Sequence, residues 1–416
     1  MRYVIALLAL VISPIVAAQP EHEVYKLLHE MHEATKAADH EAYFDMFTED
    51  AVFFGTDIWE RWPKHEFESL YRPYMEGGNG WWFQMRDRHI DVQPGETVAL
   101  FDETLYSESY GQCRGSGACR LEDGEWKITR YHLDITIPNG ASGDVVNSIR
   151  EFEANNIELM TFNIRYGTAN DGINSWQNRG NTVSALIRGD LPDVIGIQEA
   201  LHSQILDLEP VLPGYKWTGV GRDDGKEKGE YAPIFYNTDK LELVNSGTFW
   251  FSESPDEPGT TSYGNTIPRI CTWAHFSAIH ASEPTHFMVA NVHLDHQSAE
   301  SRLRSMQQVK DLLAQDGLAE NYPCFVLGDF NCTPDSEPAT VLLGNGWKTA
   351  VDDENAVGTF HGFTGEPGNR IDMIMIPDRC EATEAEVITV GGGENGIWPS
   401  DHFPVRAIVT LKPASE

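Results

Sequence analysis

The spacing of apolar residues divides the chain into two patterns. In the first part, apolar positions recur at helical spacing within Glu21–Lys36 and then alternate with polar ones along four later segments, 81–92, 97–107, 112–121 and 125–137. Tyr43, Phe44 and Phe47 predict a second short helix, and Asp123-Gly124 indicates a tight hairpin between the last two strands. Helices followed by an antiparallel meander predict an α+β domain.

Beyond residue 157 the apolar runs are continuous, as expected for strands that are buried on both faces. Each run has a carboxylate, amide or imidazole at one end: Asn163, Glu199, His293, Asp329 with Asn331, Asp372, and Asp401 with His402. Alone, Gly328-Asp329-Phe330-Asn331 could be a turn. The recurrence of polar ends on six runs instead favours one site assembled from many strand ends.

These residue types restrict the chemistry of such a site. Carboxylate and amide oxygens favour Mg²⁺, Mn²⁺ or Ca²⁺. Spacings typical of zinc sites and of phosphate-binding Gly-rich loops are absent from the sequence. A divalent ion beside histidines and acids suits metal-assisted hydrolysis of a phosphate ester.

The ordered set of polar ends resembles the endonuclease/exonuclease/phosphatase superfamily, which has the deoxyribonuclease I-like fold, over about residues 157–412. The resemblance implies a four-layer α/β/β/α sandwich. It also implies that Glu199 is the main metal ligand, that Asn163 lies beside it, and that Asp401 is part of the same metal site. His402 corresponds to a general base oriented by Asp372.

The same resemblance implies roles for three further residues. Asp329 and Asn331 would position the nucleophile and bind a phosphate oxygen, and His293 would protonate the leaving group or steady the phosphate. Each histidine could instead be structural. Two sets stay open: Asn291 and Asp295 either support the site or bond within loops, and the arginines beside the motifs are either phosphate clamps or solvated residues, namely Arg165, Arg302, Arg304 and Arg370.

Residues 22–138 resemble SnoaL-like, nuclear transport factor 2-like domains, through Phe53-Phe54-Gly55-Thr56-Asp57 and Gly124-Glu125-Trp126-Lys127-Ile128. The resemblance implies an α+β cone that binds a ligand, catalyses or forms a homodimer. Its aromatic residues either line a pocket or form the core: Trp59, Trp62, Trp81, Trp82 and Tyr131. Residues 139–156 are expected to be a linker, with a helical turn over 145–152.

Residues 1–18 read as a secretory signal peptide, because a basic start precedes an apolar stretch and small residues. We therefore expect a periplasmic or extracellular protein without a membrane span. The six cysteines form no disulfide framework and are expected to be structural thiols.

The formal charge of the chain is −34, from 30 Lys and Arg against 64 Asp and Glu. The sequence contains no cluster of basic residues of the kind that a nucleic-acid-binding protein uses to contact many phosphates. The sequence therefore predicts a secreted, metal-dependent phosphoesterase with a small or head-group-sized substrate and no stable nucleic-acid complex. The alternatives are an extracellular nuclease and a ligand-binding or dimerising protein on an inactive hydrolase scaffold.

Overall fold

The computed structural model describes residues 20–56, 60–279, 285–352, 356–389, 391–392 and 396–411. These form two compact units, one made of residues up to 64 together with 78–136, the other of 65–77 together with 137 onward. Asp57, Trp59 and the expected signal peptide lie outside the described residues. Among the described helices, none combines the length and apolarity needed to cross a membrane.

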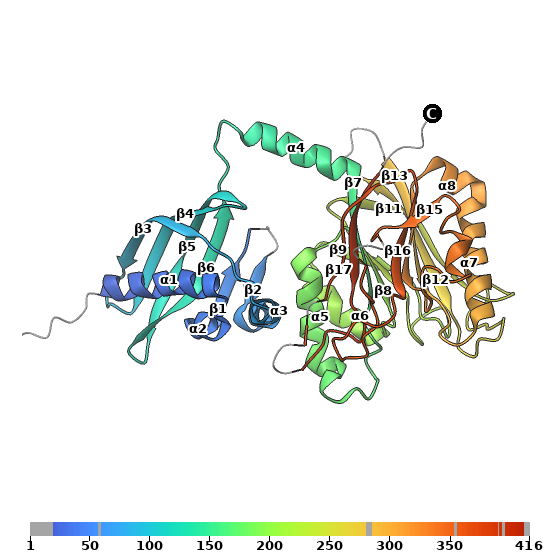
Figure 1. Ribbon diagram of the computed structural model, residues 1–416, viewed down its shortest axis with the longest axis horizontal. Helices are drawn as coiled ribbons and strands as arrows, with labels where there is room; N and C mark the ends of the chain where they lie inside the picture. Colours follow the sequence, from blue (N-terminus) through green and yellow to red (C-terminus); the bar gives the residue numbers. More distant parts are fainter. Residues whose placement is uncertain are drawn as a thin grey trace, which may run out of the picture. The chain divides into compact units, whose positions relative to one another are not determined.

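The first part of the chain forms one six-stranded sheet in the order β2-β1-β6-β5-β4-β3, with helices before and between its strands (Figure 1). β1 pairs with β6 in parallel, and β3 to β6 form the expected antiparallel meander. The elements are α1 (Pro20–Ala37), α2 (His40–Asp45), β1 (Phe47–Phe54), β2 (Arg61–Pro63), α3 (Lys64–Glu76), β3 (Gln84–Val92), β4 (Val98–Ser107), β5 (Gly111–Glu122) and β6 (Glu125–Ile135).

Several details differ from the sequence-based expectation. The second helix ends at Asp45, and Phe47 is the first residue of β1 instead of part of the helix. β3 begins at Gln84, three residues later than predicted. The hairpin at Asp123-Gly124 is confirmed, because both residues have positive φ, 51° and 90°, as a tight type I′ turn requires.

A charged group lies in the interior of this domain. The fully buried Glu103 carboxylate accepts hydrogen bonds from His32 Nε2 (2.9 Å), from the Tyr131 hydroxyl (2.9 Å) and from Arg88 Nε and Nη2 (2.8 and 2.6 Å). Burial alone would raise the pKa of Glu103, but His32 and Arg88 lower it below its usual value. Three side chains of the same domain therefore stabilise this carboxylate.

The aromatic residues that were expected to line a pocket or to form the core differ in burial. Trp62 and Tyr131 are buried in the core, whereas Trp82 is exposed. Trp62 and Tyr131 thus follow the alternative of a structural core.

The second part contains two six-stranded sheets, β17-β18-β7-β8-β10-β9 and β11-β12-β13-β14-β16-β15. Its strands are β7 (Asn156–Asn163), β8 (Val194–Gln198), β9 (Tyr215–Thr218), β10 (Ile234–Asn237), β11 (Leu241–Trp250), β12 (Ile270–Ala278), β13 (Thr285–His293), β14 (Cys324–Asp329), β15 (Trp347–Thr349), β16 (Asp372–Pro377), β17 (Ala382–Val387) and β18 (Val405–Thr410). Its helices are α4 (Ser142–Asn155), α5 (Trp176–Asp190), α6 (His202–Leu208), α7 (Ala299–Ala314) and α8 (Leu318–Asn321), with 3₁₀ turns η1 (Gly172–Asn174), η2 (Glu209–Val211), η3 (Gln315–Gly317) and η4 (Ala339–Val341).

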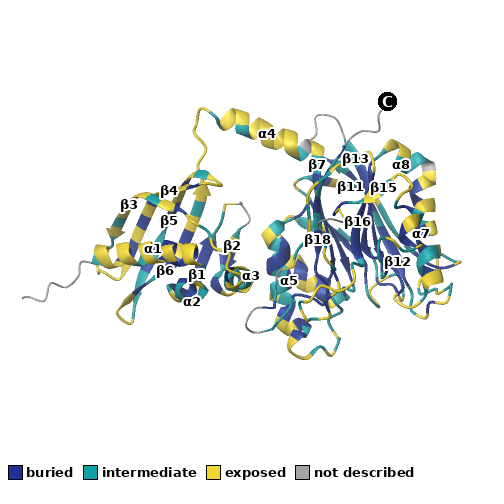
Figure 2. Ribbon diagram, in the orientation of Figure 1, coloured by how far each residue is buried: buried dark blue, intermediate teal, exposed yellow. Residues whose placement is uncertain are grey.

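The two sheets pack face to face, and helices cover their outer faces (Figure 1). Side chains from both sheets, such as Leu159, Phe287 and Phe325, share the central core. α5 and α6 pack on the outside of the first sheet through Val183 and Ile205, and α7 packs on the second through Val309. The predicted four-layer α/β/β/α sandwich is confirmed, and Figure 2 shows its buried strands between exposed helix faces.

One buried amide links the two sheets. The fully buried Asn291 on β13 donates to the carbonyls of Ile197 (2.8 Å) and Pro233 (2.9 Å) and accepts from Gln198 Nε2 (2.7 Å). All polar atoms of the Asn291 side chain have hydrogen-bond partners within the fold. Asn291 therefore has a structural role, which is to link the two sheets.

The segment expected to be a linker with one helical turn is mostly helix. α4 spans 14 residues, and most of its side chains are exposed. All six cysteines are buried and free, as expected for structural thiols.

Candidate active site

The strand ends that the sequence singled out converge at one edge of the sandwich. In the second sheet, His293 pairs in register with Asp329, and Asp329 with Asp372, so three neighbouring strands place these side chains in a row. In the first sheet, Asn163 ends β7, and Glu199 follows β8. The Asn163 amide donates to Asp329 Oδ2 (3.0 Å) and to Glu199 Oε1 (3.1 Å), which joins the two rows across the sheets.

His402 and Asp372 form a buried pair. His402 Nδ1 lies 2.8 Å from Asp372 Oδ2, which assigns a proton to Nδ1 and leaves Nε2 to face Asp329 Oδ2 at 4.0 Å. Burial by itself lowers the pKa of His402, but the carboxylates of Asp372, Asp329 and Asp401 raise it to about 10. The bond to Asp372 fixes the orientation of the ring, and the neighbouring carboxylates stabilise its protonated form.

Asp329 is held in a fixed orientation at the centre of the row. Its Oδ1 accepts the backbone N–H of Asn331 (2.8 Å), and its Oδ2 accepts from Asn163. Burial and the nearby Asp372 carboxylate raise the pKa of Asp329. The chain turns at Asn331, whose φ is +48° and whose side chain donates to the Leu294 carbonyl (3.0 Å).

The predicted metal ligands gather around Arg165. Its guanidinium lies 3.9 Å from Glu199 Oε2 and 3.8 Å from Asp401 Oδ2, and it is bonded on its other side to Asp171 (3.2 Å). Asn163 lies beside Glu199, but its side-chain oxygen accepts the backbone N–H of Arg165 (3.0 Å). Burial raises the pKa of Asp401, and the Glu199 charge adds to this effect.

The donor set fits a hard divalent cation. Glu199 and Asp401 supply carboxylate oxygens, which are the ligands that a hard divalent cation prefers. Among the described residues, Arg165 is the only arginine within 4 Å of both carboxylates. A second group, Asp329, Asp372 and His402, has ligand atoms within 4.8 Å of one another, and Asp372 Oδ1 is buried without a hydrogen-bond partner. Two groups of the site therefore offer ligands to a divalent cation: Glu199 with Asp401, and Asp329 with Asp372 and His402.

His293 has a neighbour that sequence reasoning missed. The buried guanidinium of Arg269 donates to His293 Nε2 (2.8 Å) and to His296 Nδ1 (2.7 Å). Since arginine only donates, both ring nitrogens must be unprotonated acceptors. Burial and the positive charge of Arg269 lower the pKa of His293 well below its usual value, which favours steadying the phosphate over protonating the leaving group.

A buried ion pair lies next to this cluster. Arg222 and Glu230 meet through two contacts of 2.7 Å, and Glu230 Oε2 lies 3.9 Å from His293 Nδ1. Neither residue ends a strand, so the pattern that located the other residues did not select them. A charged residue in an otherwise apolar run, such as Arg269 just before β12, is a signal that was available in the sequence.

Arg179 on α5 braces the loops that carry the site. Its fully buried guanidinium donates to four backbone carbonyls, those of Asn174 (2.8 Å), Ile164 (2.6 Å), Pro399 (2.8 Å) and Arg165 (2.8 Å). Asn163 precedes two of these carbonyls in the chain, and Asp401 follows a third. One side chain therefore fixes the two predicted metal-binding segments to each other.

The structure distinguishes between the roles that the sequence left open for Asp295 and four arginines. Asp295 accepts the backbone N–H groups of Gln297 (3.0 Å) and Ser298 (2.7 Å) and also faces Arg269 Nε at 3.4 Å, so it combines loop bonding with support of the site. The four arginines differ: Arg165 is in the site, Arg302 donates to the Asp295 carbonyl (2.7 Å), Arg370 donates to the Val351 carbonyl (2.7 Å), and Arg304 lies on an exposed helix face.

Comparison with known families matches both parts of the chain. The model of the Endonuclease/Exonuclease/phosphatase family matches residues 160–402, and the model of the SnoaL-like domain matches residues 24–138.

Two solved structures resemble the second part. An endonuclease/exonuclease/phosphatase from Bacteroides vulgatus is 35% identical, with a TM-score of 0.57, over 62% of this chain and 99% of that chain. A mannosyl-6-phosphatase from Bacteroides thetaiotaomicron is 30% identical, with a TM-score of 0.56, over 61% of this chain and 99% of that chain. An uncharacterised protein of Acanthamoeba polyphaga mimivirus is 27% identical over 184 residues, which is 42% of this chain and 67% of that protein.

Proposed function

The chain belongs to the endonuclease/exonuclease/phosphatase family, and on that premise we propose that it is a divalent-metal-dependent phosphoesterase acting on small phosphomonoesters. The observation that carries the proposal is the His402–Asp372 pair, which faces Asp329 beside the oxygen ligands Glu199 and Asp401. A degenerate scaffold would be expected to lack one of these groups, and all of them are present and oriented.

The chain's own residues provide for activation and positioning of water. In the proposed step, His402 Nε2, 4.0 Å from Asp329 Oδ2, accepts a proton from a water molecule as the water oxygen attacks phosphorus. The bond from phosphorus to the leaving oxygen breaks, and the leaving alkoxide takes its proton from solvent. Asp372 holds the Nδ1–H and stabilises the imidazolium that forms. Asp329, fixed by Asn163 and Asn331, orients the water, and Arg269 with neutral His293 balances the charge of the phosphoryl oxygens.

A divalent cation held by Glu199 and Asp401 would neutralise charge on the phosphoryl oxygens and, by the same charge, lower the pKa of His402 toward the range in which it accepts a proton. Members of the family generally use such a cation, and the oxygen donors here favour Mg²⁺ or Mn²⁺ over zinc. Ca²⁺ is a further candidate on the same grounds.

Two observations support a small phosphomonoester. The mannosyl-6-phosphatase that resembles this chain acts on a phosphorylated sugar, and it covers the whole hydrolase part. In addition, residues 155–416 hold 17 Lys and Arg against 37 Asp and Glu, which disfavours a substrate with many phosphates.

The test is hydrolysis of a substrate panel by metal-stripped and metal-restored protein. We expect chelation to abolish release of phosphate from sugar phosphates, and Mg²⁺ or Mn²⁺ to restore it. Full turnover after complete removal of the metal would exclude metal dependence. Inactivity on every phosphoester with every cation would instead favour the inactive-scaffold alternative.

Export and self-association are further parts of the proposal. The apolar start of the chain supports cleavage before Gln19 and export, which the N-terminal sequence of the protein from the periplasm or medium would check. The resemblance of residues 24–138 to SnoaL-like domains supports a homodimer formed through this part. Sedimentation equilibrium should then give twice the mass of one chain, and a single-chain mass would exclude the dimer.

A further inference from the structure

The buried His402–Asp372 pair is built from two segments that lie 30 residues apart in the chain, and a third segment joins them. Asp372 is the first residue of β16, and His402 lies before β18. The joining segment, residues 359–362, contacts both. Its first residue, Thr359, is fully buried, although its hydroxyl is polar and needs hydrogen-bond partners in the interior.

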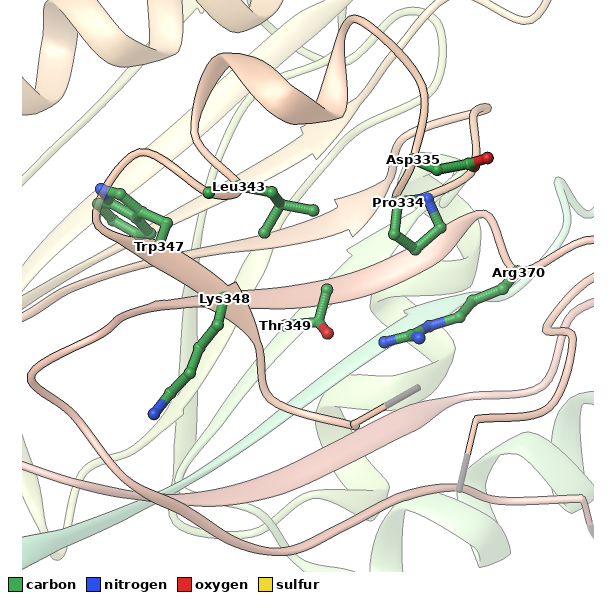
Figure 3. Close-up of a pocket in the computed structure, with 8 residues that line it drawn as sticks. Pro334, Asp335, Leu343, Trp347, Lys348, Thr349 and Arg370 are labelled. Atoms are coloured by element: carbon green, nitrogen blue, oxygen red, sulfur yellow. The ribbon is translucent and has the colours of Figure 1, made fainter. Parts of the chain in front are cut away.

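The Thr359 side chain holds the start of β16. Its Oγ1 accepts the backbone N–H groups of Ile371 and Asp372, each at 3.0 Å. A hydroxyl oxygen has two acceptor positions, and these two N–H groups occupy them. Arg370, one residue earlier, instead directs its side chain toward a cavity of about 570 Å³ (Figure 3). Of these three consecutive residues, Thr359 therefore fixes the backbone of the two that end at the catalytic pair.

The backbone of the same segment holds His402. The Thr359 carbonyl accepts the N–H of Phe403 (2.8 Å), and Phe360 forms an antiparallel bridge with His402. The carbonyl of Asp401 accepts two further N–H groups of the segment (2.9 and 3.0 Å). The Phe360 ring also lies edge-on to the imidazole of His402, with 5.0 Å between the ring centroids. The segment thus contacts three consecutive residues around the imidazole.

The bonds from this segment to β16 depend on the chemistry of the Thr359 side chain. Valine has the shape of threonine but offers no acceptor, so it would leave two buried N–H groups without a partner. A simpler interpretation is that the hydroxyl only satisfies these groups. It does not account for their place in the site, because one N–H belongs to Asp372 itself and the carbonyl of the same threonine binds the residue that follows His402. One residue therefore couples the positions of both members of the pair.

We propose that Thr359 is a positioning residue, which keeps the Asp372 carboxylate within hydrogen-bond distance of His402 Nδ1. The proposal rests on the proposed phosphoesterase function and deepens it, because Asp372 orients the ring that accepts the proton of water. Loss of the hydroxyl lets the start of β16 move and lengthens the 2.8 Å contact between the two side chains. A displacement of about 1 Å can lower a catalytic rate roughly 10²-fold, even when its cause lies outside the reacting groups.

The kinetic test compares Thr359→Val, which removes the acceptor, with Thr359→Ser, which keeps it. With Mg²⁺ and a hydrolysed sugar phosphate, Thr359→Val should lower kcat about 10- to 100-fold and leave KM unchanged, since no group that binds the substrate is altered. Thr359→Ser should restore most of the wild-type kcat. The matched control is Thr272→Val: Thr272 is equally buried, but its hydroxyl meets that of Thr248 on the neighbouring strand (3.1 Å), so kcat should not change.

A spectroscopic test reads the hydrogen bond itself and needs no turnover. The N–H proton of a histidine bonded to a buried carboxylate resonates far downfield of the amide protons, and its loss in His402→Ala assigns the resonance to this residue. The resonance should persist in Thr359→Ser and Thr272→Val, and should shift upfield or vanish in Thr359→Val. A general loss of stability in a folded variant would not move it.

The outcomes separate the positioning role from the proposed function. Wild-type kcat, or an unchanged resonance, in folded Thr359→Val would overturn the positioning role, as would an equal loss of kcat in Thr359→Ser. If Thr359→Val does not fold, Thr359→Cys takes its place under the same criteria, because a thiol accepts only weakly. If the wild-type protein hydrolyses no phosphoester, the proposed function fails, and the resonance alone decides whether Thr359 holds the pair.

Discussion

The imidazole of His402 is enclosed by carboxyl groups and shielded from water. Charge that is buried this way is costly unless it is paired, so three acids close to one ring are more readily explained by proton transfer than by stability. The arrangement also explains why both members of the His402–Asp329 pair have pKa values raised above the usual range, one by its anionic neighbours and the other by burial.

Replacing either member of this pair should separate activity from folding. His402→Ala and Asp329→Ala are expected to lower turnover by about 10²- to 10⁴-fold, the usual contribution of a positioned base. Steady-state rates on a hydrolysed phosphomonoester, alongside thermal unfolding, measure the two effects. Near-normal rates in a folded variant would contradict the assigned roles.

Arg179 provides a different single-residue test, because it touches no reacting group. Arg179→Met leaves four buried carbonyls without a donor, and each unsatisfied group costs about 1–3 kcal/mol, so we expect a loss on the order of 3 kcal/mol after relaxation. Arg179→Lys keeps the positive charge but cannot donate to all four carbonyls, because lysine lacks the planar guanidinium. We therefore expect it to weaken Mn²⁺ binding, which electron paramagnetic resonance measures.

A matched control for Arg179 is Arg406→Met on β18. Arg406 contacts three carboxylates of the same domain, the partly buried Glu158 and Asp190 and the exposed Glu386. Its loss should also cost stability, about 1–3 kcal/mol, because two partly buried carboxylates lose their partner, but it should leave metal binding unchanged. Equal effects of the Arg179 and Arg406 changes on Mn²⁺ affinity would rule out the bracing role.

At the scale of elements, the polar residues of the site come together because several strands of the sandwich end at the same edge. β13 and β14 run in parallel and β16 antiparallel to β14, so the C-terminal ends of two strands and the N-terminal end of a third meet there. Apart from Asn291, the middle of these three strands is apolar, and the side chains of His293, Asp329 and Asp372 lie at this edge.

Gly328 makes the last step of β14 possible. Its φ is +146°, and a Cβ there would lie 2.0 Å from the Val292 carbonyl oxygen of the neighbouring strand. Gly328→Ala should therefore cost more than about 2 kcal/mol through strain and a backbone clash, and should displace Asp329. Urea unfolding and turnover measure the two effects.

The control for Gly328 is Gly346→Ala in an open turn. Gly346 also has a positive φ, +87°, but nothing lies within 4 Å of the added carbon, so only the conformational cost of about 1 kcal/mol is expected. If both variants lost the same stability, the close approach of β13 and β14 would not be the reason for the glycine.

The same elements show which parts of the site could be predicted from the sequence alone. Strand ends such as Asn163, Asp329 and Asp372 were predictable because a polar residue after a continuous apolar run has few structural explanations. The turn at Asn331 was one of two alternatives, because its positive φ is a conformation that Asn tolerates but does not require. α4 was predicted too short, because its exposed faces carry a weak apolar periodicity.

Residues that act through long-range contacts were also beyond the sequence. Glu230 approaches His293 only after the two sheets have packed, and no local spacing relates these two residues. Arg179 lies on a helix whose pattern is satisfied without it, and its four acceptors are backbone atoms that no sequence motif marks.

For the whole molecule, charge decides which substrates approach. A protein that binds duplex DNA along many phosphates gains affinity by releasing counterions through a basic track. The hydrolase part instead carries 20 more acidic than basic residues, and its arginines near the site are engaged by Asp171, Glu230 and the two imidazoles. Long-range repulsion should therefore keep duplexes away, while one phosphate can still reach the cation.

The resulting prediction concerns substrate size. With Mg²⁺ at physiological salt, the purified protein should hydrolyse sugar phosphates efficiently and degrade plasmid DNA slowly or not at all. Because the Debye length is about 8 Å under these conditions, raising the salt should screen the repulsion and weaken the discrimination instead of sharpening it. Phosphate release and plasmid nicking, assayed side by side at two salt concentrations, give the ratio directly. Plasmid degradation that is more efficient than hydrolysis of every small phosphoester would show that the metal site overrides the charge of the domain and that the extracellular nuclease is the correct alternative.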